Sequence, residues 1–256
     1  MRSVVLLGLV GSTALLSSIA GATVTVSPNV NTVLPGNAQG PTPFNYYGSS
    51  GSRNQTVYSA SDFTALGGLQ SITDIKFRPY PGSAGSGFSS ATFTVSSVIV
   101  TLSTTSKAEA GLNALSPTYS DNVGANVKTV YTGPITMTST TTDAPGGATK
   151  LFDYAIALQS PFTYNPQAGN LLVDITIPNG ATVSGGGFGF VTFDHANTGG
   201  DGIASVGNIS TGSSITGTYS TDGAIAQFTT SAVPEPASLA VLGLVGMALI
   251  SRRRRA

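Results

Sequence analysis

The chain has 256 residues with 32 glycines, no cysteine and no tryptophan, and it carries eleven basic and eleven acidic residues. The lack of cysteine excludes disulfide bonds and cysteine-ligated zinc sites. Five of the eleven basic residues lie at the two ends. Without Arg2, Glu235 and the arginines of 252–255, six basic and ten acidic residues remain, which is a net charge of −4. This acidic body has no basic face to neutralise phosphates, so nucleic-acid binding is not expected.

The first 22 residues have the pattern of a secretory signal peptide. Arg2 precedes an uncharged, largely apolar run over residues 4–16, and sites with the small-x-small pattern end at Ala20 and Ala22. We therefore expect export through the Sec route and cleavage by signal peptidase after one of these two alanines.

Residues 23–55 contain four prolines and little periodic pattern. They predict an extended N-terminal arm wrapped on the domain, with one strand over 23–27. Beyond this arm, short helices are expected at 61–66, which begins Ser-Asp, and at 107–115.

The body of the chain, residues 23–231, predicts an all-β domain. Apolar side chains alternate with period two over 150–159 and 170–178, as they do in a half-buried strand. Over 91–104 the alternation changes phase at Ser96 and Ser97, which predicts a β-bulge. Further strands are expected at 72–80, 127–132, 187–193, 203–209, 215–219 and 224–229. Many short strands separated by turns indicate one antiparallel β-sandwich or jelly-roll-like domain.

The tail, residues 232–256, combines three chemical features in a fixed order. Pro234, Glu235 and Pro236 cannot form a helix, because the prolines fix φ and remove backbone donors. The run 237–250 is uncharged and mostly apolar, and as a helix it would be about 21 Å long at about 1.5 Å per residue. The final cluster is Arg252, Arg253, Arg254 and Arg255. Arginine stems that reach the headgroups lengthen such a span, and arginines keep that end in the cytoplasm. The tail therefore predicts a transmembrane helix.

This order of features resembles the PEP-CTERM sorting signal, which is the substrate tag of the exosortase system in Gram-negative bacteria. The resemblance rests on residues 234–236, the span 237–250 and the arginine cluster 252–255, about a tenth of the chain. It implies that an exosortase recognises the tag and cleaves near 234–236. The protein would be an inner-membrane intermediate before it reaches the cell surface or extracellular matrix, often beside exopolysaccharide.

His195 is the single histidine, so any Ser-His-Asp triad would need it as the base. No Gly-x-Ser-x-Gly elbow accompanies it, and we interpret it as a surface loop residue. A hydrolase of the glycosidase type would need two facing carboxylates, and the sequence indicates no pair. We therefore expect no catalytic residues.

Calcium is the only metal for which the sequence offers candidates, and they are weak. Asp194, Asp201 and Asp222 lie nearest the glycine-rich turns, but they do not form a D-x-D-x-D-G loop. We expect these aspartates to be solvated turn residues, and we expect no cofactor.

Carbohydrate binding remains an alternative, because modules of this fold class stack sugar rings on exposed aromatic side chains. The candidate contacts in or beside loops are Tyr46, Tyr47, Tyr80, Tyr119 and Tyr164. Exposed tyrosines on one sheet face would favour this alternative, and buried ones would remove it. The sequence as a whole predicts a non-catalytic structural or adhesive β-domain at the surface. The alternatives are an exopolysaccharide-binding module and, second, a secreted hydrolase.

Overall fold

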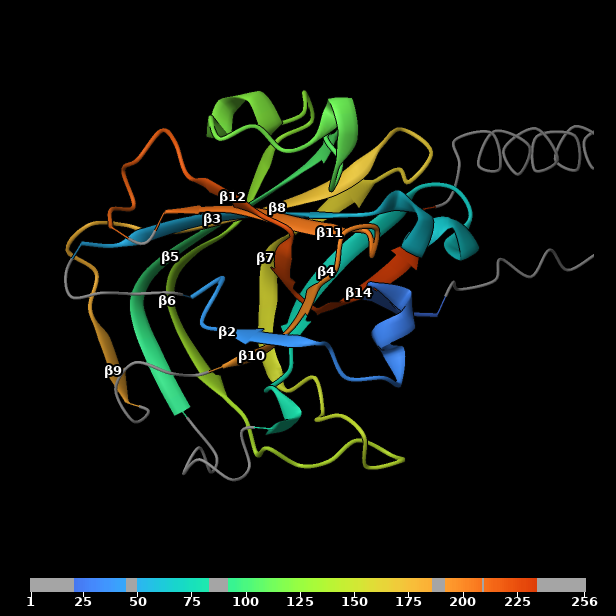
Figure 1. Ribbon diagram of the computed structural model, residues 1–256, viewed down its shortest axis with the longest axis horizontal. Helices are drawn as coiled ribbons and strands as arrows, with labels where there is room; N and C mark the ends of the chain where they lie inside the picture. Colours follow the sequence, from blue (N-terminus) through green and yellow to red (C-terminus); the bar gives the residue numbers. More distant parts are fainter. Residues whose placement is uncertain (1–20, 45–49, 83–91, 186–191, 209, 234–256) are drawn as a thin grey trace, which may run out of the picture.

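A computed structural model describes residues 21–44, 50–82, 92–185, 192–208 and 210–233. These residues form antiparallel strands joined by loops and short 3-10 helices (Figure 1). The short helices are η1 (Asn29–Thr32), η2 (Ala60–Leu66), η4 (Gly111–Asn113) and η5 (Tyr119–Asn122). The prediction of an all-β chain with antiparallel sheets packed together is confirmed.

The larger sheet has seven strands in the order β12-β11-β3-β8-β5-β6, with β9 paired to β5. Their bounds are β3 (Ser52–Tyr58), β5 (Thr92–Thr105), β6 (Lys128–Thr138), β8 (Asn170–Ile177), β9 (Val183–Gly185), β11 (Ile203–Asn208) and β12 (Thr218–Ser220). The loop that joins β5 to β6 carries η4 and η5 and lies over the outer face of this sheet, at the top of Figure 1. We call residues 106–124 the insert.

The second sheet has the order β1-β14-β4-β7, and a third, smaller sheet has the order β13-β10-β2. The four strands of the second sheet are β1 (Thr23–Ser27), β4 (Gln70–Phe77), β7 (Tyr154–Tyr164) and β14 (Ala226–Ala232). The smaller sheet consists of β2 (Ala38–Gly40), β10 (Phe193–Asn197) and β13 (Asp222–Ala224). Its two outer strands hold β10 between an N-terminal and a C-terminal piece of the chain.

The core lies between the four-stranded and the seven-stranded sheets. Alternate side chains point inward, so Ile75 of β4, Val100 of β5 and Val173 of β8 are all buried in one cluster. Tyr58 and Phe228 meet edge to face across the cluster, with ring centroids 5.1 Å apart. Each fully buried side chain of this size contributes about 1.5–3 kcal/mol, which makes the core the main source of stability.

The predicted bulge at Ser96 and Ser97 is confirmed, because the β5–β6 register shifts between Val95 and Val98. The shift lets Val95 and Val98 both point into the core, although they are three residues apart.

A second irregularity joins the two large sheets. The β4–β7 register jumps between Ile72 and Asp74, so β7 has extra residues there. In this stretch Gln159 donates from Nε2 to the Thr132 carbonyl oxygen (2.9 Å) and accepts from the Thr132 N–H (3.0 Å). The side-chain amide thus pairs the open edge of β6 as a strand would.

Several local predictions need correction. The helix expected over 107–115 is only the short turn η4, while the helix expected at 61–66 is the 3-10 turn η2, capped by the Ser59 hydroxyl. The strand predicted at Thr23–Ser27 is confirmed as β1. The arm expected to extend to residue 55 ends earlier, because Ser52 begins β3, which lies between β8 and β11 in the seven-stranded sheet.

Candidate functional site

The last residue before the sorting motif Pro234–Pro236 that the structure describes is Val233. Pro234, Glu235, Pro236, the span 237–250 and the arginines 252–255 lie outside the described residues, as does the signal peptide through residue 20. Within the described residues, no helix is long and apolar enough to span a bilayer. The Val233 N–H donates to the Leu69 carbonyl oxygen (2.9 Å), so the chain is held by the four-stranded sheet to this point.

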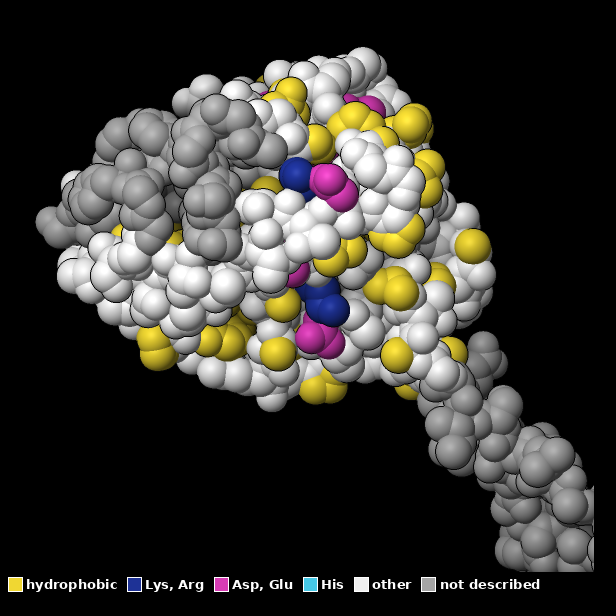
Figure 2. All heavy atoms as spheres, turned by 90° about the horizontal axis from the view of Figure 1, so that it is seen from below, with side chains coloured by type: hydrophobic (Ala, Val, Ile, Leu, Met, Phe, Trp, Pro, Cys, Tyr) yellow, Lys and Arg dark blue, Asp and Glu magenta, His cyan; other side chains and the backbone are white. Residues whose placement is uncertain are grey.

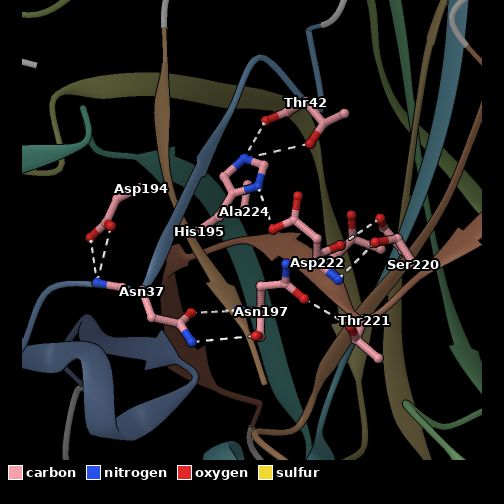
Figure 3. A network of polar contacts seen from close by, with 12 residues as sticks. Asn37, Thr42, Asp194, His195, Asn197, Ser220, Thr221, Asp222 and Ala224 are labelled. Carbon is pink, nitrogen blue, oxygen red and sulfur yellow. Dashed lines mark hydrogen bonds and ion pairs between the residues drawn. The ribbon is translucent and has the colours of Figure 1, made fainter. Parts of the chain in front are cut away.

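His195 lies on β10 with its imidazole fully buried (Figure 3). Its Nδ1 is 2.9 Å from Oδ1 of Asp222, and its Nε2 is 3.1 Å from the Thr42 carbonyl oxygen. A side chain on Gly40 would come within 2.6 Å of the ring, so β2 packs directly against it. The interpretation of His195 as a surface loop residue is therefore wrong, since strand pairing on both sides carries the ring inward.

Thr42, His195 and Asp222 lie in the order of a nucleophile, a base and an orienting acid, but the Thr42 hydroxyl is not the oxygen nearest to the ring. The Thr42 hydroxyl is 3.5 Å from Nε2, whereas its carbonyl oxygen is closer. A carbonyl only accepts, so in the tautomer that satisfies this contact Nε2 donates to Thr42 and has no lone pair for the hydroxyl proton. The buried ring also offers no face to a substrate. These residues fasten the loop at Thr42 to β10 and β13.

Asp194, the residue before His195, forms a second buried contact. Its Oδ2 accepts from Nε of Arg78 (2.8 Å), and neither side chain has any exposed surface. Arg78 also donates to the Leu34 carbonyl oxygen, and Asp194 accepts from the Gly36 N–H. Burial raises the pKa of the Asp194 carboxyl, despite the opposing charge of Arg78. Burial likewise lowers the pKa of the Arg78 guanidinium.

The three calcium candidates do not converge. Asp194 is bound to Arg78 and Asp222 to His195, while Asp201 accepts from the Thr198 N–H (2.9 Å) in its own turn. In the parts of the chain that the structure describes, no three His, Cys, Asp or Glu side chains gather as metal ligands. The aspartates thus form three separate structural contacts. Asp194 and Asp222 pair with side chains from other parts of the chain, so the prediction that they are solvated turn residues is wrong.

A polar cluster that the sequence analysis missed lies under the insert. Arg53 of β3 donates from Nε (3.1 Å) and Nη2 (2.6 Å) to the carboxylate of Asp174 on β8. Gln55 donates to the same carboxylate, and its amide oxygen accepts from Asn122 of the insert (2.9 Å). Burial alone would lower the pKa of Arg53, but the hydrogen bond and charge of Asp174 leave it raised.

The proposed sugar contacts separate into different environments. Tyr119 and Tyr164 are 1% and 0% exposed, and their hydroxyls donate to the carbonyl oxygens of Arg53 and Gly169. Burial raises the pKa of Tyr119 to about 12. Neither ring offers a stacking face, because each packs within the domain. Tyr80 is half-buried, and Tyr46 and Tyr47 lie outside the described residues.

The acidic side chains share one property. Each of the ten carboxylates in the described residues makes a hydrogen bond within the chain, and in most cases the partner is a backbone N–H, a hydroxyl or a cation that fixes a loop. The ten are Asp62, Asp74, Glu109, Asp121, Asp143, Asp153, Asp174, Asp194, Asp201 and Asp222. The acids of the body thus have partners within the chain, and Asp174, Asp194 and Asp222 bind side chains from other parts of it.

Comparison with known proteins identifies the tail. A family model described as the PEP-CTERM protein-sorting motif matches residues 232–255. The chain carries a PEP-CTERM sorting motif. The match includes Pro234, Glu235 and Pro236, and it implies that this PEP-CTERM protein is exported, sorted by an exosortase and associated with the cell surface.

The match begins at residue 232, the last residue of β14, and does not include the rest of the β-domain. No other family is recognised in the chain, and no curated protein or solved structure matches it. The function of the β-domain must therefore be argued from its own residues.

Proposed function

We propose that the β-domain of this PEP-CTERM protein is a non-catalytic structural or adhesive component of the cell surface or extracellular matrix. It crosses the inner membrane by the Sec route, loses its signal peptide, and is freed when an exosortase cleaves near Pro234–Pro236. The observation that supports a non-catalytic role is that each of the ten acidic side chains in the described residues makes a hydrogen bond within the chain. Acid–base catalysis needs such a group within reach of a substrate.

The exposed face of β5 and β6 supports an adhesive role. Paired threonine hydroxyls lie across these strands at Thr92–Thr138 (2.9 Å), Thr94–Thr136 (2.8 Å) and Thr101–Thr129 (3.4 Å). These rows give a hydroxyl-bearing sheet face that suits contact with a hydrated polymer. Exopolysaccharide is therefore the first partner to test, and contact with it would use these hydroxyls in place of the buried Tyr119 and Tyr164.

The first test is the intact mass of the protein from envelope and medium fractions of native cells. The proposal expects a chain that starts after Ala20 or Ala22 and ends near Pro234–Pro236, in the surface or medium fraction. A chain that retains the arginines 252–255 and occurs only in the inner membrane would contradict release.

The second test separates adhesion from catalysis. In a deletion strain, cell cohesion should return with the wild-type gene and equally with a His195→Gln/Asp222→Asn variant, once both are compared at the same amount of folded surface protein. Thr94→Asp/Thr136→Asp should reduce cohesion and retention of purified exopolysaccharide, because it places charge on the hydroxyl face. Loss of cohesion in the first variant, with its folded protein undiminished at the surface, would indicate catalysis.

A further inference from the structure

The chain enters and leaves the β-domain at one corner. β1 and β14 pair antiparallel, so Thr23, at the start of β1, lies opposite Thr230, near the end of β14. The Thr230 hydroxyl also donates to the Thr23 carbonyl oxygen (3.4 Å). The sorting motif, which begins at residue 232, therefore continues directly from the corner where the mature N-terminus begins.

The connection from this corner to the predicted membrane span is short. Val233 is bound to Leu69, and the apolar run begins at Ala237, four Cα steps later. Four extended steps reach at most about 14 Å. The headgroup region is only about 5–8 Å thick on each side of the bilayer, so the tagged domain must lie against the headgroups.

Exposed aliphatic side chains lie on β1, which starts at this corner, and in and after η1, which follows the other end of β1. Val24 is 58% exposed on β1, and Val30, Val33 and Leu34, in and just after η1, are 59%, 68% and 51% exposed. η1 packs beside β1 at the right of Figure 1, and hydrophobic side chains are visible on this side of the molecule in Figure 2. We call Val24, Val30, Val33 and Leu34 the N-terminal apolar patch.

The patch also carries no charge of its own. Residues 3–52 contain no Lys, Arg, Asp or Glu. The nearest acid, Asp62 of η2, accepts from the Ser27 hydroxyl (2.5 Å) and the Asn29 N–H (3.2 Å). An uncharged surface with exposed valine and leucine enters the lipid interface without the cost of desolvating an ion.

We propose that the N-terminal apolar patch is the surface that the tagged protein rests on the bilayer. Four aliphatic side chains bind a lipid surface weakly when they are free, but the tag holds them at high effective concentration beside it. Cleavage at 234–236 removes that advantage, so the released domain leaves the membrane. The patch thus makes membrane contact depend on the tag.

Single-cysteine labelling tests this, because the chain has no cysteine of its own. The chain from residue 21 to 256 is reconstituted in vesicles of phosphatidylethanolamine and phosphatidylglycerol, with a fluorophore at Val33→Cys. The matched control is Leu112→Cys, which lies fully exposed on the insert. The proposal expects the label at position 33 to lose most of its quenching by aqueous iodide and to gain quenching by brominated lipid, while position 112 remains open to iodide.

Two further arms keep the test decisive. A chain that ends at Val233 should show no lipid quenching at position 33, and Val33→Asp/Leu34→Asp should abolish lipid quenching of a label at Val24→Cys in the tagged chain. Equal iodide quenching at positions 33 and 112 in the tagged chain would overturn the proposal. Protection of position 33 in the shortened chain without vesicles would also overturn it, because a second copy would then cover the patch.

Discussion

Residues 28–44 and the insert both cross the packed sheets with few strands of their own, and an ion pair fastens each of them. The N-terminal segment is held by Arg78 and Asp194, which have no exposed surface. The insert lies over Arg53 and Asp174, whose side chains are 26% and 7% exposed. The same pairing of arginine with aspartate thus occurs in two solvent environments within one domain.

The two ion pairs differ in whether burial or attraction to the partner has the larger effect on the pKa of the arginine. Burial lowers the pKa of Arg78 and raises that of Asp194, so loss of water outweighs attraction for both partners. For Arg53 the hydrogen bond and charge of Asp174 outweigh burial, and its pKa is raised. Removing one partner of the Arg78–Asp194 pair should therefore strongly destabilise the fold. The Arg53–Asp174 attraction outweighs the cost of burying Arg53.

The largest effect is expected when one partner of the fully buried pair is removed. Arg78→Met leaves the Asp194 carboxylate buried without its cation, and it should lower the free energy of unfolding by about 3–5 kcal/mol. Arg53→Met should lower it by only about 1.5–3 kcal/mol, the range for a hydrogen bond to a charged group. Urea unfolding of the 21–233 chain measures both.

A double variant sharpens this difference. Arg78→Met/Asp194→Asn should recover part of the stability lost in Arg78→Met, because no unpaired charge remains. Similar losses for Arg78→Met and Arg53→Met, with no recovery in the double variant, would show that the two pairs do not differ as described.

A smaller and more local effect is expected under the insert. Asn122→Ala leaves the buried amide oxygen of Gln55 without its donor and should cost about 1–3 kcal/mol. Amide hydrogen exchange should rise over residues 108–123 and stay unchanged in β4 and β14. Asn113→Ala, at an exposed position of the same insert, is the control and should change neither. Uniformly faster exchange in all strands would mean that the insert is part of the global unfolding unit.

Glu109 makes a second attachment of the insert, and its loss should have a modest effect. Its carboxylate accepts from the N–H groups of Gly200 and Gly202, which lie in the turn before β11. Glu109→Gln keeps the shape but removes the charge from these bonds, and it should cost about 1 kcal/mol. Faster exchange at Gly200 and Gly202 is the expected signature. Unchanged exchange there would show that the carboxylate does not order the turn.

The smallest expected effect is a pH dependence at the attachment of η1. Burial raises the pKa of Asp62 above its ordinary value of 3.8, although the Ser27 hydroxyl and the Asn29 N–H oppose the shift. Such a carboxyl holds its proton more tightly in the folded state. Its contribution to the free energy of unfolding is therefore greatest at low pH, and it declines as pH rises from 3.8 through the raised pKa.

The Asp62→Asn variant isolates this group, because asparagine stays neutral at every pH. The difference in unfolding free energy, wild type minus variant, should fall as the pH rises from about 3.8 through the raised pKa. Urea titrations across that range measure it. A difference that grows with pH would mean that the hydrogen bonds from Ser27 and Asn29 outweigh burial.

The sequence predicted the strands whose two faces differ in polarity and missed those whose faces do not. β8 was expected because Leu171, Val173 and Ile175 alternate toward the core. β3 was missed because polar side chains lie on both of its faces. Arg53 and Gln55 point to the cluster under the insert, while Asn54 and Thr56 are buried on the other face. Alternation in hydropathy is not visible in such a strand.

The buried contacts of β10 could not be predicted, because their partners are far away in the chain. Asp194 and His195 precede Asn-Thr-Gly-Gly-Asp-Gly, which indicates a turn, and nothing nearby shows that Arg78 and Asp222 meet them. The sorting tail was recognised because its chemistry is local: prolines, an apolar run and arginines follow each other directly. A functional motif made of consecutive residues could be recognised from the sequence, whereas contacts between residues far apart in the chain could not.

The pairing of β1 with β14 also fixes the order in which the domain can form. β14 is an inner strand of its sheet, flanked by β1 and β4, and it ends at Ala232. In a chain that emerges from a translocon with its N-terminus first, β1 therefore stays unpaired until about 200 further residues have emerged and β14 is available. Until then β1 cannot join β4 and β7, because β14 lies between β1 and β4 in the sheet. The four-stranded sheet can be completed only once β14 is available, and the sorting motif begins at the last residue of that strand.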